Sequence, residues 1–178
     1  MSRTFSLLSL ILILTSCASV PFSTMLQLSS MDETDLIRIN PVEVRAKIDV
    51  EEPAQVDVDK TKITIEIENS MGAILHKFPL VLVSSTQLPT EQGFFSDSPA
   101  RTEYILKFSE TAIESFEHVQ ASLLNQEEGQ MSLSVGTSFG DLPEEVDVIT
   151  FSIHLKLSEN ENYITLFDEA AVDIKREQ

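Results

Sequence analysis

The sharpest chemical motif in the chain runs from Gly136 to Gly140 and reads G-T-S-F-G. It fits the G-x-S-x-G pattern that surrounds the nucleophile of many hydrolases, and Asp147 and His154 follow Ser138 in the expected order. That mechanism also needs a helix directly after the serine, because the helix amides help to form the oxyanion hole. The residues after Gly140 instead predict a short turn and another strand. We therefore expect Ser138 to end a strand in a protein that is not an enzyme, with a serine hydrolase as the weaker alternative.

Residues that could bind metal do not form a known pattern. The three histidines, His76, His118 and His154, stand at no spacing that grips zinc or iron. Acidic residues gather at 32–35 and 57–59, but neither group has the Asp-x-Asp-x-Asp-Gly loop of a calcium site. We expect surface histidines, no metal centre and no cofactor. A divalent-cation site assembled from separate loops is the alternative left open.

A connection predicted at 84–101 carries two adjacent aromatic residues, Phe94 and Phe95, between polar flanks. Loops of this length are usually functional or disordered. The pair could anchor a protein partner or dip into a bilayer, so Phe94 and Phe95 are the candidate partner-binding residues. The simpler expectation is that one phenylalanine caps the open end of the predicted sheet.

The elements that would position these residues are mostly strands. Apolar and polar residues alternate without fault from Val42 to Val50, which predicts a strand with one buried and one solvated face. Pro79 lies inside another apolar run, and because proline lacks the backbone donor we expect an edge strand or a bulge there. Further strands are expected at 25–31, 63–67, 75–83, 104–108, 131–135, 149–157, 163–167 and 172–174.

One segment has helical periodicity. From Ser109 to Glu128 the apolar residues fall on a single stripe, Ser109 suits the N-cap position, and Gly129 can close the C-terminus. We expect one amphipathic helix at about 109–128 packed on a mainly antiparallel sheet or sandwich. The predicted fold class is therefore α+β, in a single domain spanning 25–178.

The first seventeen residues have a different character. Arg3 is followed by a run from Phe5 to Leu14 in which eight of ten residues are apolar, and the only cysteine, Cys17, comes soon after. A spanning helix needs roughly 20 apolar residues, so this run is too short to cross a bilayer. The three-part layout instead predicts an exported chain with a removable leader. An ordinary secretory signal, with Cys17 incidental, is the alternative.

The residues Leu14-Thr15-Ser16-Cys17 resemble the lipobox of bacterial lipoprotein precursors. The resemblance implies a signal peptide at 1–16, a Cys17 bearing a diacylglyceryl group with a further acyl chain such as palmitate, and a lipidated tether at 17–24. Because Ala18 and Ser19 follow the cysteine, with no Asp in the second position, it also implies a cell outer membrane address and a domain facing the periplasm. The layout of the mature part, with its Ser-Leu-Ser-Val-Gly strand, resembles small proteobacterial lipoproteins of unassigned activity.

The charge balance limits the partners. The leader holds only Arg3, so the mature part keeps 11 basic and 29 acidic residues, a net charge of −18. Such an acidic body repels nucleic acid and anionic head groups, so we expect no nucleic-acid partner and membrane contact through the lipid anchor alone. The expected role is a non-catalytic binding or assembly module of the cell envelope with an envelope protein as its partner. A carrier of lipid or another apolar ligand is the alternative.

Overall fold

The computed structural model describes residues 21, 24, 33–70, 72–93, 98–124 and 130–174. The leader, Cys17, the expected strand at 25–31, the pair Phe94 and Phe95, and Gly129 lie outside the described residues. The described elements follow the chain in the order α2 (Glu33–Arg38), β1 (Arg45–Glu51), β2 (Val56–Asn69), β3 (Gly72–Leu88), β4 (Arg101–Phe108), α3 (Glu110–Leu123), β5 (Gln130–Phe139), β6 (Val148–Lys156) and β7 (Ile164–Asp173).

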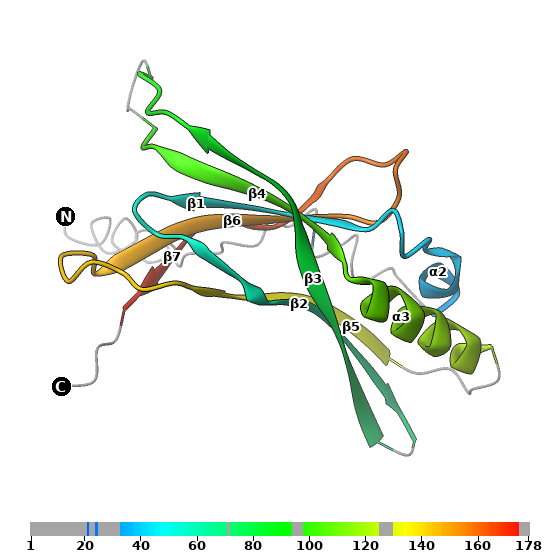
Figure 1. The fold of residues 1–178 in the computed structure, drawn as a ribbon. Helices are drawn as coiled ribbons and strands as arrows, with labels where there is room; N and C mark the ends of the chain where they lie inside the picture. Colours follow the sequence, from blue (N-terminus) through cyan, green and yellow to red (C-terminus); the bar gives the residue numbers. More distant parts are fainter. Residues whose placement is uncertain are drawn as a thin grey trace, which may run out of the picture.

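The seven strands form one antiparallel sheet in the order β5-β2-β3-β4-β1-β6-β7. The sheet curls into a half-barrel, with α3 beside β3 and α2 beside α3 (Figure 1). The fold is thus α+β and mainly sheet, as the sequence predicts. The four strands with the clearest alternation in the sequence correspond to β1, β2, β5 and β6.

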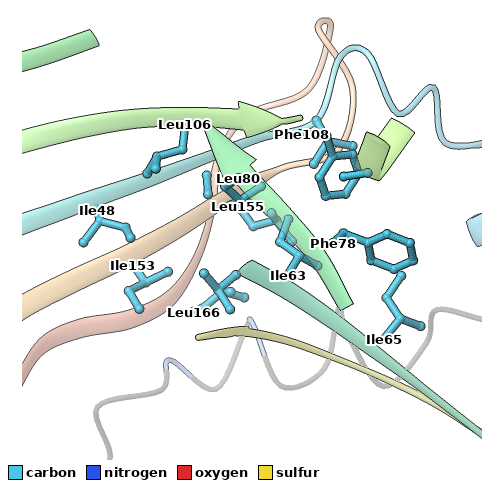
Figure 2. Close-up of a cluster of buried hydrophobic side chains, with 14 of the residues drawn as sticks. Ile48, Ile63, Ile65, Phe78, Leu80, Leu106, Phe108, Ile153, Leu155 and Leu166 are labelled. Carbon is cyan, nitrogen blue, oxygen red and sulfur yellow. The ribbon is translucent and has the colours of Figure 1, made fainter. Parts of the chain in front are cut away.

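Alternation of side chains builds the core. In β1 every second residue is buried, and Ala46, Ile48 and Val50 have no exposed surface. Figure 2 shows Ile48 gathered with Ile153 and Leu166 among residues from several strands. Burying a side chain of this size contributes about 1.5–3 kcal/mol. The intervening polar residues of β1 are left on the other face of the sheet, where the candidate site lies.

Helix α3 covers the β3–β4 side of the core. Its N-cap is Ser109, as the sequence predicts, and Ser109 Oγ accepts a hydrogen bond of 3.1 Å from the backbone N–H of Ala112. Phe116 packs in a three-ring cluster with Phe78 of β3 and Phe108 of β4, with ring centroids 5.2–5.6 Å apart. Such aromatic pairs add about 0.5–1.5 kcal/mol each beyond their buried area. The cluster fixes the helix against the sheet.

Strand β3 changes partner at Pro79. Its first half pairs with β2 as far as Pro79, and its second half pairs with β4 from Leu80 onwards, with a register shift between Leu82 and Ser84. Strand β3 carries a bulge, which is one of the two expected outcomes, but the bulge lies between Leu82 and Ser84 and not at the proline itself. Pro79 is not in an edge strand of the sheet order. It stands where one ladder ends and the next begins, and its carbonyl accepts the backbone N–H of Ser109.

The strand pair formed by β3 and β4 is longer than predicted. Residues 84–88, expected in a loop, continue β3 against the start of β4, and a single bridge joins Glu91 to Ser98. The connection predicted at 84–101 is therefore confined to 89–100. The hairpin projects from the body at the end opposite the β2–β3 hairpin (Figure 1).

Helix α2 is a second departure from expectation, because the sequence predicts only the helix at about 109–128. Leu36 is fully buried in this short helix. Gln120 of α3 supports its end, because Nε2 lies 2.8, 3.2 and 2.8 Å from the carbonyl oxygens of Leu36, Ile37 and Ile39. The last carbonyl groups of a helix lack a full set of intrahelical donors, and here the Gln120 side chain adds to the backbone N–H of Ile39, which donates to Leu36.

Candidate functional site

The polar face of the sheet carries a carboxylate, an imidazole and a hydroxyl in contact. His154 of β6 directs Nε2 to Asp49 Oδ2 of β1 at 3.3 Å and Nδ1 to Thr165 Oγ1 of β7 at 2.9 Å. The side chains of His154 and Asp49 are only 15% and 13% exposed. We name Asp49, His154 and Thr165 the cross-strand triad, because they join three neighbouring strands.

Register explains how the triad forms. His154 lies directly opposite Lys47, and Asp49 lies opposite Ser152, so the imidazole reaches Asp49 along the diagonal of the β1–β6 pair. Diagonal neighbours on one sheet face are within reach of long or aromatic side chains. The sequence predicts a surface histidine at 154, whereas the side chain is held between Asp49 and Thr165. The missing information was the register, which no local pattern contains.

Two further charges surround Asp49. Lys47 Nζ lies 3.7 Å from Asp49 Oδ2 and 3.6 Å from Glu103 Oε2. Burial by itself would raise the pKa of Asp49, but the hydrogen bond with His154 and the positive charge of Lys47 together hold that pKa below its usual value. Lys47 Nζ also lies 5.6 Å from the ring centroid of Tyr163, whose own pKa is raised by burial and by the charge of Glu103.

The triad has the order nucleophile, base and orienting acid, which activates hydroxyl groups in hydrolases. A hydroxyl must also face a cleft where a substrate can sit. The hollow beside this face, of about 360 Å³, is lined by Asp49, Ser152 and Glu169 but not by Thr165. The acid end of the triad lines the hollow, whereas the hydroxyl end, on β7, lies outside its lining. The arrangement therefore suits a polar tie between strands.

Asp49 Oδ1 is buried and has no hydrogen-bond partner among the described residues. The Asp49 carboxylate lines the 360 Å³ hollow, and Arg101 is part of the same lining. No group of three candidate ligands for a metal ion occurs within the described ranges. The unpaired oxygen is thus a buried acceptor that the described residues leave unsatisfied.

A second hollow, of about 540 Å³, lies between α2 and the β6–β7 connection. Glu43 is part of its lining and is already engaged, because its carboxylate accepts from Asn40 Nδ2 at 2.8 Å and from the backbone N–H of Glu159 at 2.9 Å. The backbone hydrogen bond, followed by that of Asn40, lowers the pKa of Glu43. Glu43 here fastens two chain segments together.

The structure places the G-x-S-x-G motif at the end of β5. Ser138 lies within β5 opposite Asp57 of β2, and the backbone N–H of Gly140 donates to the carbonyl oxygen of Gln55. The next element along the chain is strand β6, so the strand-to-helix turn of a nucleophile elbow is missing at this point of the described chain. His154 is occupied by Asp49 and Thr165 instead. The expectation that Ser138 ends a strand agrees with this geometry.

The remaining predicted residues are not brought together. His76 lies on β3, 6.5 Å from the ring centroid of Phe78, and His118 is exposed on α3. Asp57, one of the acidic residues considered for calcium, forms an ion pair of 2.9 Å with Lys60. Cys17, Phe94 and Phe95 lie outside the described residues.

An exposed apolar strip is the feature that sequence reasoning missed. Val81, Leu82 and Val83 of β3 are 38%, 45% and 51% exposed, although β3 is a central strand of the sheet order. The sequence had shown this run as a continuous apolar stretch, which reads equally well as a strand buried on both faces. Ile74 and Leu75, in the half of β3 that pairs with β2, are also exposed, at 48% and 58%.

Comparison with known proteins gives no relative: no family model matches the chain, and no curated protein or solved structure matches it significantly. Neither helix in the described part of the chain has the length and apolar character required to cross a bilayer.

Proposed function

We propose that the chain is a non-catalytic binding or assembly module of the bacterial cell envelope. In this proposal Cys17 carries the lipid and the tether at 17–24 holds the domain near the membrane. Thr24, the last residue of this tether, is buried, and its backbone N–H donates to the carbonyl oxygen of Pro21, so the reach of the tether is set by the residues before Pro21 at about 3.3–3.6 Å each. Two or more acyl chains give stable attachment, whereas one gives only marginal binding.

The observation that carries the proposal is the exposed strip Val81–Val83. The surrounding chain has 29 acidic and 12 basic residues, yet the thirteen residues from Phe78 to Thr90 contain no ionisable side chain. Exposed apolar surface of this kind commonly marks a protein interaction site. A strand that is both apolar and uncharged on a strongly acidic body is best explained as a contact surface for another protein.

The two alternatives have less support. A serine hydrolase at Ser138 needs a turn that β5 does not make. A carrier needs room inside the curled sheet, but the interior holds packed side chains such as Ile48, Leu106 and Leu155, none of which is exposed. A carrier would still be revealed by lipid that co-purifies with the protein and is identified by mass spectrometry.

Affinity capture from detergent-solubilised envelopes tests the proposal. We expect one protein to be recovered in stoichiometric amount with the wild-type chain, and to be reduced by Val83→Lys but not by Val148→Lys. Val148 is a matched control because it is 47% exposed on β6. Replacing Phe94 and Phe95 by Ala tests whether they contribute to the same contact. Recovery of the bait alone in every detergent would argue decisively against a binding module.

A further inference from the structure

The second half of β3 has one unpaired backbone edge. Residues Leu80–Leu88, which we name the β3 open edge, pair with β4 on one side. On the other side β2 pairs only with Gly72–Pro79, and a register shift between Asp57 and Lys62 separates the β2–β5 ladder into two parts. In an antiparallel ladder alternate residues direct their N–H and C=O groups away from the partner strand. The described chain supplies no backbone partner for those groups along the β3 open edge.

The β3 open edge also lacks the usual protection. Natural proteins guard free edges with Lys, Pro or inward-pointing charges. The outer edge strand β7 follows this rule with Asp168, Glu169 and Asp173. The β3 open edge has no charge, and Val81 to Val83 expose apolar side chains on both faces of the strand. The free edge of β5 is uncharged too, but its exposed positions are small and polar, as at Ser132 and Ser134.

A cleft accompanies the β3 open edge. It measures about 580 Å³, and its lining includes Ser85 and Gln87 of β3 and the β1–β2 connection at 52–55. Glu52 is the only charged residue in that lining. An added strand would therefore meet neutral side chains along most of its length and an acid near one end.

We propose that the β3 open edge receives an extended segment of a partner protein as an additional antiparallel strand. The segment would carry uncharged, β-branched residues in its centre and Lys or Arg at its ends. Main-chain hydrogen bonds provide the affinity in this mode of recognition, and side-chain contacts provide the specificity. This inference rests on the proposed function and specifies its partner.

Charge decides between a foreign strand and a second copy of the chain. Each copy has a formal net charge of −17, so two copies repel one another at long range. A cationic partner is attracted by the same negative field. The field brings the partner to the protein surface before its uncharged central segment pairs with β3. Glu52, beside the cleft, favours a basic residue at one end of the docked segment.

A peptide-binding experiment tests the inference on the full-length lipidated protein in detergent micelles. The probe is a fluorescent peptide of sequence Lys-Thr-Val-Thr-Val-Thr-Val-Lys, and the comparison peptides replace both Lys by Glu or the central Val by Pro. We expect only the parent peptide to bind, and its binding to slow amide hydrogen exchange within 80–88. Val83→Lys should weaken binding about tenfold through like-charge repulsion and lost apolar contact, whereas Val148→Lys should leave it unchanged.

Several outcomes overturn the inference. It fails if no peptide binds, if the Glu-ended peptide binds equally well, or if protection falls on β5 instead of β3. Sedimentation that shows a dimer separated by Val83→Lys would assign the edge to a second copy. Thermal unfolding of Val83→Lys checks that the fold survives. If Val83→Lys captures a stoichiometric envelope partner as well as wild type does, the proposed function stands, but the β3 open edge is not the binding site.

Discussion

Phe139, on the edge strand β5, packs against Phe151 of β6, and the two ring centroids lie 5.4 Å apart. These strands are far apart in the sheet order, with β2, β3, β4 and β1 between them. The contact therefore crosses the open side of the half-barrel, and Phe167 of β7 extends it at 6.3 Å from Phe151. Side chains, not backbone pairing, hold the two ends of the curled sheet together.

Phe139→Ala should lower the free energy of unfolding by about 2 kcal/mol, since Phe139 is partly buried and loses both contact area and a ring pair. Phe139→Leu keeps most of the apolar volume and should cost clearly less. A double-mutant cycle with Phe151→Ala, measured by urea unfolding, should give a coupling of about 1 kcal/mol. Strictly additive effects would mean that the two rings do not stabilise one another.

The pKa of Asp49 gives a pH-dependent prediction. Because the fold lowers this pKa, the carboxylate contributes stability that is fully present above its unfolded-state pKa of about 3.9, and that is lost as the pH falls through the folded value. Asp49→Asn should therefore be less stable than wild type by about 1–2 kcal/mol at pH 7, the size expected for a hydrogen bond to a charged group. The difference should shrink below pH ~4.

Urea unfolding at a series of pH values measures this effect. The control is Glu117→Gln, which removes a negative charge from an exposed position on α3 and should change stability by less than about 0.5 kcal/mol at every pH. A pH-independent loss in Asp49→Asn would show that the residue acts through packing and not through its ionised form.

Much of the fold could be predicted because its elements are locally encoded. Strand β1 has one buried face since Ala46, Ile48 and Val50 alternate with charged residues, and this period is visible in the sequence alone. Helix α3 begins at Ser109 because a serine cap and an amphipathic stripe coincide. Local propensity and tertiary packing favour the same structure at these positions, so the sequence pattern alone predicts the structure.

The parts that could not be predicted depend on relationships between distant residues. Nothing near Pro79 specifies that β3 leaves β2 there and continues with β4, so the free backbone edge of Leu80–Leu88 was not predicted. The Asp49–His154 contact depends on the register of β1 against β6 in the same way. Helix α2 was missed because it is six residues long and is held by Gln120, which lies more than eighty positions away.

Gln120 therefore makes a testable contribution to the docking of α2. Gln120→Ala should cost about 1 kcal/mol, because the carbonyl groups of Leu36 and Ile39 each lose the hydrogen bond from the Gln120 side chain. Gln120→Glu, of the same shape but with no donor at that position, should cost at least as much, since a carboxylate would face carbonyl oxygens. Hydrogen exchange should accelerate within 33–39 in both variants while that of β1 stays unchanged. Unchanged exchange in 33–39 would show that buried Leu36 alone holds the helix.

The lipid anchor is tested at Cys17. If the lipobox resemblance is correct, wild-type protein should fractionate with membranes and incorporate labelled palmitate, because two or more acyl chains hold a soluble body stably on a bilayer. Cys17→Ala should abolish labelling and leave either an uncleaved precursor or a chain in the soluble fraction. Ser30→Ala, beyond the tether, should behave as wild type. Mass analysis that finds a mature wild-type chain without acyl groups would overturn the anchor, while the β3 open edge could still be assayed on the released domain.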